Sequence, residues 1–465
     1  MPGLEDASRE ELLALVVEQA RMIEQLTARV VELERRLARN SRNSSQPPSA
    51  DGPAVPSPRS RRGSGRKPGK QPGSPGHTLT LVDDPDEIVE HVPGCCRNCG
   101  AGLADGEPAG AVRRQVHDIP PVRPMIVEHR LHRRRCGCGQ VTVADAPAGV
   151  SAPVQYGPSL RALAVYLLVF QHVPVARTAQ LIADLTGARP STGWVISALG
   201  EAAAALADVE KLIKSMLVLG HVLHVDETSV SINGARWWLH VAGTDTLTAY
   251  HLHSSRGRPA VTEFGVLPDY RGVAVHDALS VYDAYPDATH ALCGAHLARE
   301  LTAATEAHPD EIWPDQALAA LLSLNSAAHH ARDQGLSQIP AAVADPLHDR
   351  WRHAILCGLA SHRPVPGRKQ SKTRNLLIRL RDRDEQVLRY ARDLTVPFTN
   401  NQAERDLRPA KTQLKISGCH RSEAGARAWV RVRGYISTVR KHGDNVLTAL
   451  RDAITGNPWT PPQPA

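Results

Sequence analysis

The sequence of 465 residues contains few aromatic side chains and no long hydrophobic run. Aromatic residues make up 4% of the chain and hydrophobic residues 42%, so we expect cores built mainly from Leu, Val and Ala, as in helix-rich globular proteins. The strongest apolar run, residues 162–170, is short, whereas a helix that spans a bilayer needs about 20 residues. This run therefore predicts a buried helix rather than a membrane span.

The sequence also lacks the marks of a secretory signal in its first residues. The stretch MPGLEDASREELLALVVEQ carries acidic residues where a signal would carry basic ones, and no small-residue cleavage site follows it. Eight cysteines in a long, non-secreted chain indicate reduced thiols or metal ligands rather than a disulfide framework. The expected location is the cytoplasm, and the composition excludes collagen-like and wholly disordered proteins.

The length and the charge of the chain limit the classes of function further. A chain of 465 residues is too long for one ordinary core and suggests about three domains, which excludes a lone small binding module. The formal net charge is +7 and the isoelectric point is about 9.1. A polyanionic partner is therefore favoured, and nucleic acid is the leading candidate.

The N-terminal segment repeats apolar residues at alternating steps of four and three, as in the seam of a coiled coil. The seam positions are Leu12, Val16, Gln19, Ile23, Leu26, Val30, Leu33 and Leu37. Charged residues lie between them, so residues 1–39 are predicted to form a coiled-coil oligomerisation helix, with Gln19 helping to set the register. The alternative is a helix that packs on the body of the same chain.

Residues 40–78 are predicted to be a disordered basic linker. Proline, serine and glycine dominate the segment, and little in it can form a core. The segment has one acidic residue, Asp51, and seven basic residues. Such clustering suits contacts with DNA phosphates, for which we select four side chains: Arg62, Arg66, Lys67 and Lys70. A linker that is merely soluble remains the alternative.

Two short cysteine clusters predict a zinc-ribbon-like, DNA-binding domain at residues 79–150. The ligands would be Cys96, Cys99, Cys136 and Cys138, four thiolates that provide a tetrahedral cage for a structural Zn²⁺. The segment VRRQVHDIPPVRPMIVEHRLHRR between the clusters has strand-like alternation and is expected to supply the hairpin of the ribbon. Cys95 is a competing ligand, and unliganded buried thiols are the alternative.

Residues 151–217 have the pattern of a helical, helix-turn-helix-like domain. Three helical stretches are expected, in SLRALAVYLLVFQH, VARTAQLIADLTG and STGWVISALGEAAAALADVEKLI. Ser191 or Thr192 is the expected N-cap of the third helix. Helical hairpins with short turns are also common in domains that do not read DNA, so DNA readout by the third helix stays one of two interpretations.

From residue 218 the pattern changes to strands and then alternates with helices. The stretches HVLHVDETSV, ARWWLHVAGT and LTAYHLHSSRG predict a three-strand meander with a turn at residues 244–246. A helix, an apolar strand GVAVHDALSVY and a strand that leads into the helix HALCGAHLARELTAAT follow. The order β-β-β-α-β-α-β-α predicts an α/β domain with a ribonuclease H-like mixed sheet covered by helices.

Two acidic residues are expected at strand ends in this sheet, Asp226 after the first strand and Asp277 after the fourth. Strand ends are where α/β sheets place their sites, and carboxylates there suit Mg²⁺, which prefers hard oxygen ligands. Two such ions clamp the attacking and leaving oxygens of an in-line displacement. The residues alone leave the third ligand open among Glu404, Asp406 and Glu423, and Asp283 competes with Asp277.

Over nearly its whole length the chain resembles the insertion sequence 66 family of transposases, which are DDE transposases. The matching stretches follow one another in order: NSRNSSQPPSAD, RKPGKQPGSPGH, the cysteine clusters, HVDETSV, HDALSVYD, CGAHLARE, TNNQAERDLRPAK and SGCHRSEAGARAWVRVRGYISTVRKHG. Each stretch is modest alone, but their common order and spacing are specific.

The resemblance implies that the catalytic residues are Asp226, Asp277 and Glu404, and that they bind two Mg²⁺ or Mn²⁺ ions. It implies a catalytic domain in residues 218–298 and 396–413, with a helical insertion at 299–395. Residues 414–465 are then a basic helical C-terminal region.

The surroundings of Glu404 agree with a role at the site. Thr399 and two asparagines can cap a helix there, on which Glu404, Arg408 and Lys411 share one face. Pro409 predicts that this helix is short or kinked. The alternative is that Glu404 pairs with Arg408 at the surface. Candidate DNA contacts in this region are Arg405, Arg408, Lys411 and Arg421, among ten Lys or Arg between residues 404 and 441 that are expected to bind phosphates.

Cys293 and His296 are spaced as in a motif that resembles one of the family. Two ligands do not make a full zinc site. They are expected either to support the catalytic residues from behind or to contact the DNA end, and core packing is an equal alternative.

The sequence thus predicts a DNA transposase that binds the terminal inverted repeats of its element as a homo-oligomer, cuts the ends and transfers the strands to target DNA. Such a protein would be bacterial and nucleoid-associated when bound to DNA. The resemblance also implies small accessory proteins as partners. Two alternatives are a catalytically inactive DNA-binding regulator and a metal nuclease without strand transfer.

Overall fold

The computed structural model describes residues 8–37, 39–40, 43–44, 79–367 and 369–462. The chain divides into two compact units, one of residues 59–125 and one of residues 1–58 and 126–465. Most of the predicted linker and its four candidate DNA contacts, Arg62, Arg66, Lys67 and Lys70, lie outside the described residues.

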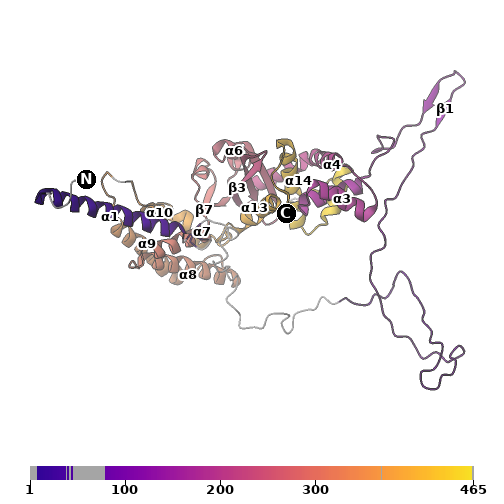
Figure 1. The fold of residues 1–465 in the computed structure, drawn as a ribbon, viewed down its shortest axis with the longest axis horizontal. Coiled ribbons are helices and arrows are strands. Elements are labelled where there is room, and N and C mark those ends of the chain that lie inside the picture. The colour runs from indigo at the N-terminus through magenta and orange to yellow at the C-terminus, as the bar shows by residue number, and fades with distance from the viewer. Residues whose placement is uncertain (1–7, 38, 41–42, 45–78, 368, 463–465) are drawn as a thin grey trace. The chain divides into compact units, whose positions relative to one another are not determined.

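A five-stranded mixed sheet lies at the centre of the larger unit (Figure 1). Its strands are β3 (Val222–Ile232), β4 (Ala235–Gly243), β5 (Thr248–His253), β6 (Val273–His276) and β7 (Thr289–Leu292), in the order β5-β4-β3-β6-β7. The first three strands are antiparallel, whereas β6 and β7 run parallel to β3. The predicted meander and the two strands after it are therefore confirmed.

Strand β3 is longer than the sequence suggested. It pairs with β6 only over residues 222–224, but β4 pairs with it from His224 to Ile232 and keeps it extended. The turn to β4 consists of Asn233 and Gly234, both with positive φ, as in the two-residue turns that match the twist of a hairpin. Asp226 consequently lies inside a strand, so its expected position at a strand end is wrong.

Helices cover the sheet on both faces. α13 (Asn401–Ser417) packs on β3 and β4, while α6 (Arg258–Phe264) packs on β4 and β5, where Phe264 stacks on His251. α14 (Glu423–Lys441) runs along the edge strand β5, and the Thr438 hydroxyl accepts a hydrogen bond from the backbone N–H of Thr248. Such cover protects an edge that would otherwise pair with another chain.

A buried ion pair joins these layers. Lys441 of α14 donates to Asp406 of α13 over 2.8 Å and to the carbonyl oxygens of Thr244 and Leu247 in the β4–β5 turn. Both charged side chains are nearly inaccessible, so the loss of either partner would leave an uncompensated charge.

The expected helix between β6 and β7 is absent. The structure has only a short 3₁₀ segment there, η5 (Ser280–Ala284). A second 3₁₀ segment, η4 (Leu267–Asp269), precedes β6. The connection after Asp277 is too short for an α-helix that crosses the sheet.

The helical region before the sheet confirms the predicted buried helix. It consists of α2 (Pro158–Val165), the π-helical turn η3 (Tyr166–Phe170), α3 (Val175–Thr186), α4 (Thr192–Ala205) and α5 (Ala207–Val218). Ser191 caps α4 by accepting the backbone N–H of Trp194, as expected. The third predicted helix is broken at Leu206 and continues as α5. These helices, α14 and α15 (Val446–Ile454) share one hydrophobic core with the sheet.

A second hydrophobic core lies among the helices that follow β7. They are α7 (Gly294–Ala307), α8 (Trp313–Asp333), α9 (Ala341–Ser361), α10 (Lys372–Asp382), α11 (Asp384–Val387) and α12 (Arg389–Arg392). In Figure 1, α8, α9 and α10 gather together, and α9 contacts both of the other two. Fully buried Trp351 and Leu324 show that this block has an interior of its own.

The cysteine-containing region differs from the predicted ribbon. Its hairpin consists of β1 (Arg133–Arg135) and β2 (Val141–Val143), which flank the second cysteine cluster. Residues 112–131, expected to form strands, have no regular structure, and Val116, Ile119 and Ile126 are exposed. Alternating apolar and polar residues do not form a stable strand unless a partner strand or a hydrophobic core lies against them.

The N-terminal helix α1 (Arg9–Leu37) covers the predicted heptad segment. Its apolar seam side chains, among them Ile23, Leu26 and Leu37, are exposed. In the part of the chain that the structure describes, no helix is both long and apolar enough to cross a membrane.

We expect Gly272→Ala to destabilise the protein by at least about 1–3 kcal/mol, the usual cost of overpacking. A methyl group at Gly272 would lie 2.5 Å from the carbonyl oxygen of His221 and 2.7 Å from that of Gly220, and backbone atoms cannot rotate away. Urea unfolding measures the loss.

Gly200→Ala is the matched control. Gly200 lies in α4, where an added methyl group would meet open space, so this change should stabilise the protein by about 0.5–1 kcal/mol. Equal stability of both variants would contradict the packing described for Gly272.

Candidate active site

Asp226 and Asp277 come together because of the register between β3 and β6. Val222 pairs with Val273 and His224 with Val275, so Asp226 and Asp277 lie at the same level, just beyond the end of the paired segment. Partners in parallel strands point to the same face. The backbone N–H of Leu279 donates to Asp277 and that of Glu227 to Asp226, which orients both carboxylates.

Glu227 is a third carboxylate at this point, which sequence reasoning missed. Ligand oxygens of Asp226, Glu227 and Asp277 all lie within 4.8 Å of one another. Neighbours along a strand normally point to opposite faces, so the place of Glu227 next to Asp226 gave no reason to expect both carboxylates at one point. The adjacent acids in HVDETSV were the available signal, and their contact with Asp277 depends on the tertiary structure.

Two groups hold the Glu227 side chain. Arg256 donates to one oxygen from two nitrogens, at 2.8 and 2.6 Å, and the Tyr282 hydroxyl donates to the other oxygen at 2.6 Å. The side chain of Glu227 has no solvent exposure. Arg256 thus offsets part of the negative charge at the site.

Glu404 approaches the same point from the first turn of α13. Burial raises the pKa of Asp226 to about 8, and the negative charges of Glu227, Asp277 and Glu404 act in the same direction. Glu404 does not belong to the group of ligand atoms within 4.8 Å among the described residues. The structure therefore brings Asp226 and Asp277 together and places Glu404 beside them.

The other acidic candidates are occupied elsewhere. Asp406 is paired with Lys441, and Glu423 with Arg427 on the next turn of α14. Asp283 is held by both terminal nitrogens of Arg383, at 2.9 and 2.6 Å. Within the described residues Glu404 makes no ion pair, so the alternative of a Glu404–Arg408 pair finds no support.

Pro409 does not end the helix that carries Glu404. α13 continues to Ser417, so of the two expectations, a short helix or a kinked one, the short helix is wrong. Asn400, predicted as a cap, does not cap it with its side chain. The Asn400 amide instead donates to the carbonyl oxygen of Val225 and hydrogen-bonds His224, over 2.8 and 2.9 Å, which fastens the start of α13 to β3.

Cys293 and His296 lie beside this junction. The Cys293 sulfur accepts the backbone N–H of Asn400, and burial raises the pKa of its thiol. Burial lowers the pKa of His296, while the positive charge of Arg299 acts in the same direction and the negative charges of Glu404 and Asp277 oppose it. Cys293 is thus a buried contact at the start of α13, and these observations fit core packing as well as support of the site.

The carboxylate group fits a hard divalent cation. Three carboxylates supply only oxygen ligands, which suits Mg²⁺ or Mn²⁺. Arg256 supplies one positive charge against the three carboxylates. A cation would be held chiefly by Asp226 and Asp277.

The ten basic residues between Glu404 and Lys441 do not form a single surface. Arg408, Lys411 and Arg421 are exposed. In contrast, Arg433 and Lys441 are internal, and Arg431 pairs with Glu210 over 2.6 Å. The expectation that all ten bind phosphates is therefore wrong.

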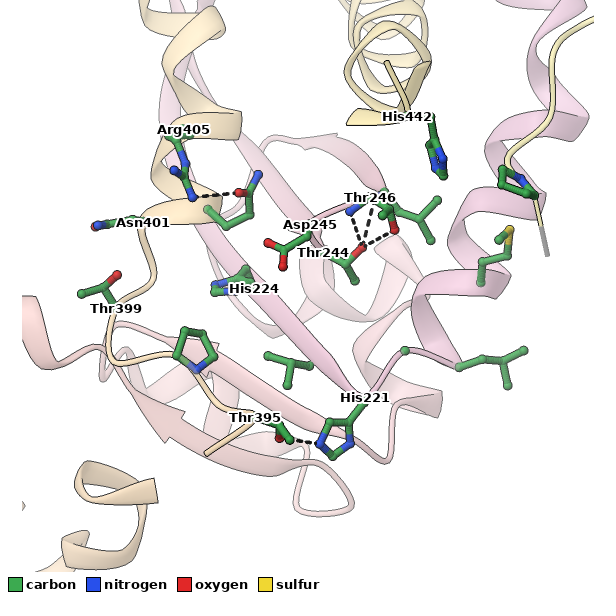
Figure 2. A pocket seen from close by; sticks show the side chains of 18 residues that line it. His221, His224, Thr244, Asp245, Thr246, Thr395, Thr399, Asn401, Arg405 and His442 are labelled. Atoms are coloured by element: carbon green, nitrogen blue, oxygen red, sulfur yellow. Dashed lines mark hydrogen bonds between the residues drawn. The ribbon is translucent and has the colours of Figure 1, made fainter. Parts of the chain in front are cut away.

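A pocket of about 690 Å³ lies between the start of β3, the β4–β5 turn and the start of α13. Arg405 of α13 and His221 at the start of the sheet lie at its opposite ends, and His224 lies between them (Figure 2). Arg405 donates to Gln402, and His221 hydrogen-bonds Thr395. None of the four acids lines the pocket in the described chain, so its polar walls are separate from the carboxylates.

Each cysteine cluster forms a tight turn. In the first, the N–H groups of Asn98 and Cys99 point at the sulfur of Cys96; hydrogen bonds from Cys99 are the main reason that the pKa of Cys96 is lowered. In the second, hydrogen bonds from Cys138 lower the pKa of Cys136. Low thiol pKa values favour the thiolate, the form that binds zinc.

The raised pKa of Asp226 predicts how the metal-free protein responds to pH. The folded protein holds a proton on Asp226 up to about pH 8, whereas the ordinary value is 3.8. The free energy of unfolding is therefore highest below about pH 4, where Asp226 is protonated in both the folded and the unfolded protein. It falls as the pH rises to about 8, because the unfolded protein releases this proton first. Asp226→Asn should therefore stabilise the protein above pH 8 by a few kcal/mol, since one pKa unit corresponds to about 1.4 kcal/mol.

Thermal unfolding between pH 4 and 9 in a chelator measures this effect. The control is Asp269→Asn, which changes an exposed acid. This variant should show the same dependence of unfolding temperature on pH as the wild type. Mg²⁺ should stabilise the wild type more than Asp226→Asn. Parallel profiles of wild type and Asp226→Asn would contradict the charge balance described for the site.

Comparison with known protein families gives three matches. Residues 153–428 match the family described as transposase IS66 family, and residues 93–139 match the zinc-finger binding domain of transposase IS66. Residues 1–80 match a family of unknown function. No curated protein matches the chain.

Proposed function

The chain belongs to the IS66 family of transposases, and we propose that it binds the terminal inverted repeats of its insertion sequence and carries out metal-dependent DNA cleavage and strand transfer. The observation that carries this proposal is the meeting of Asp226 and Asp277 at one level of the sheet, with Glu404 facing them from α13. The zinc-finger match supports DNA binding by the same chain.

We assign the sheet to the ribonuclease H-like fold. Three antiparallel strands followed by two parallel ones, in the order β5-β4-β3-β6-β7, support this assignment. The helices α7 to α12 with their own core support a helical insertion at residues 299–395. In the same way, α3 and α4 with the Ser191 cap support a helix-turn-helix-like domain at residues 151–217.

The catalytic roles follow from the positions of the carboxylates. Asp226, Asp277 and Glu404 hold two Mg²⁺ or Mn²⁺ ions. Bound divalent cations supply Lewis-acid chemistry and generate a nucleophile at neutral pH. Glu227, fixed by Arg256 and Tyr282, positions Asp226 and Asp277 and adds negative charge behind them. Cutting the element end and joining its 3′-hydroxyl to target DNA are both in-line phosphoryl transfers, so one carboxylate group serves both steps.

DNA contacts come from exposed basic side chains on α13 and in the segment that follows it. Arg408, Lys411 and Arg421 are exposed, and Arg405 reaches into the 690 Å³ pocket. Phosphate contacts of this kind fix the position of the DNA and carry no sequence information. Arg62, Arg66, Lys67 and Lys70 in the basic linker add further phosphate contacts.

Zinc and self-association complete the proposal. Cys96, Cys99, Cys136 and Cys138 hold one structural Zn²⁺, which the zinc-finger match and the lowered thiol pKa values support. Helix α1 forms a coiled coil with a second copy of the chain, since the apolar residues of its heptad seam are exposed along its whole length. Residues 79–150 and 1–39 would thus bind DNA and join protomers, respectively.

We expect Asp226→Asn, Asp277→Asn and Glu404→Gln each to lower cleavage of DNA that carries the element ends by at least about 10²-fold, the order seen when one electrostatic stabiliser is removed from an active site. Cleavage in Mg²⁺ or Mn²⁺ is followed on labelled DNA. The control is Glu423→Gln, which changes an exposed acid paired with Arg427 and should cleave as the wild type does.

The same assay separates the alternatives. Uncut DNA with the wild-type chain under all metal conditions would indicate a DNA-binding regulator. Cleavage without joining of pre-cut 3′-hydroxyl ends to a target plasmid would indicate a nuclease. Full cleavage by Asp226→Asn would refute the assignment of the catalytic residues.

Placing a charge in the heptad seam should dissociate the oligomer. Ile23→Asp and Val30→Asp bury a carboxylate between apolar side chains, so light scattering after gel filtration should show monomers. Arg21→Asp places the same charge outside the seam and should leave the oligomer intact. A wild-type chain that is monomeric at all concentrations would exclude the coiled coil.

A further inference from the structure

Three side chains that commonly bind transition metals meet in the helical block, away from the carboxylate group. His308 caps the C-terminal end of α7, Glu311 lies in the connection to α8, and His362 caps the C-terminal end of α9. Their ligand atoms all lie within 4.8 Å of one another. Neither the family nor the carboxylate chemistry gives this group a role.

The distances suit a shared tetrahedral ion. His362 Nε2 lies 2.9 Å from Glu311 Oε2, and His308 Nδ1 lies 3.9 Å from Glu311 Oε1. Zinc bonds of about 2.0–2.2 Å in a tetrahedron keep ligand atoms about 3.3 Å apart. The two separations run to different oxygens of Glu311, so side-chain rotations would have to bring one of these oxygens to about this distance from both nitrogens. The two imidazole rings meet edge to face, with centroids 4.6 Å apart, so both can direct a nitrogen to one point.

Neighbouring groups orient the three ligands. Thr373 of α10 hydrogen-bonds His308 Nε2 over 2.9 Å, which leaves Nδ1 directed at Glu311. The indole N–H of Trp313 donates to Glu311, and Arg374 donates to the carbonyl oxygen of His362. Hydrogen bonds to the far side of metal ligands are typical of metal sites, where they fix the ring and the tautomer.

The cluster is open to solvent. Side-chain exposures of 29%, 28% and 15% for His308, Glu311 and His362 leave a solvent path for an ion and a fourth ligand.

We propose that His308, Glu311 and His362 bind a second Zn²⁺, distinct from that of the cysteine clusters, with water as the fourth ligand. Two imidazole nitrogens and one carboxylate suit zinc rather than Mg²⁺. The ion joins the connections α7–α8 and α9–α10, and so fixes the end of α7, the helix whose first residues contact Phe398 and Asn400. The site stands independently of the proposed transposase reaction.

The test is the zinc content of the full chain, purified with zinc and dialysed against metal-free buffer, measured by mass spectrometry. Glu311→Gln and His362→Gln should each contain one zinc ion per chain less than the wild type, while the control His329→Gln, an exposed histidine of α8, should contain as much as the wild type. Wild-type zinc content in both ligand variants would overturn the proposal and leave a hydrogen-bonded cluster.

Two further variants distinguish this zinc ion from the one at the cysteine clusters and test the site without removing a ligand. Cys96→Ser with Cys99→Ser should retain one zinc per chain, and complete loss of zinc there would also overturn the proposal. Thr373→Val keeps all three ligands and should weaken zinc binding by about 10–100-fold in competition with a chelator. Unchanged affinity in Thr373→Val would contradict the role assigned to its hydroxyl.

Discussion

Repulsion between carboxylates at the end of β6 is the constraint on which the rest of the site depends. Two like charges about 4 Å apart in a protein interior of effective dielectric 20 repel by about 4 kcal/mol, and this fold holds three carboxylates within 4.8 Å. The β3–β6 register forces two of them together, and Arg256 offsets only part of their charge. The fold thus maintains a place where a divalent cation would relieve the repulsion.

Asp226, Asp277 and Glu404 make no ion pair within the described residues, whereas several other acids near the sheet, Glu227 among them, are paired with a basic side chain. Asp406 is paired with Lys441 inside the protein, Asp283 with Arg383, and Glu423 with Arg427. Each pair joins two elements or two turns of a helix. Glu404 makes no such pair within the described residues, and its negative charge adds to the field at Asp226. The presence or absence of an ion-pair partner, rather than the number of acidic residues, therefore separates candidate catalytic residues from structural ones.

The helical block after β7 leaves the sheet and returns to it at one point. The chain departs at Cys293 and Gly294, and the return passes Phe398 and Asn400, with backbone hydrogen bonds between the two sides. Because both ends of the block are held there by hydrogen bonds, the length of the block adds little to the entropy cost of positioning Glu404. Glu404 comes four residues after Asn400 in the chain. The same junction carries Cys293 and the Asn400 amide that binds β3.

Local patterns in the sequence determined the strands of the meander, the helix at the N-terminus, the Ser191 cap and the cysteine turns, because period, turn residues and caps act within a few positions. Motif resemblance pointed to Asp226, Asp277 and Glu404. Tertiary structure alone decided that β3 runs on past Asp226, since β4 pairs with it there, and that α13 passes through Pro409, since its side chains pack on the sheet. It also brought in Glu227 and joined His308 to His362, because contacts between distant residues depend on register and packing, which no local pattern encodes.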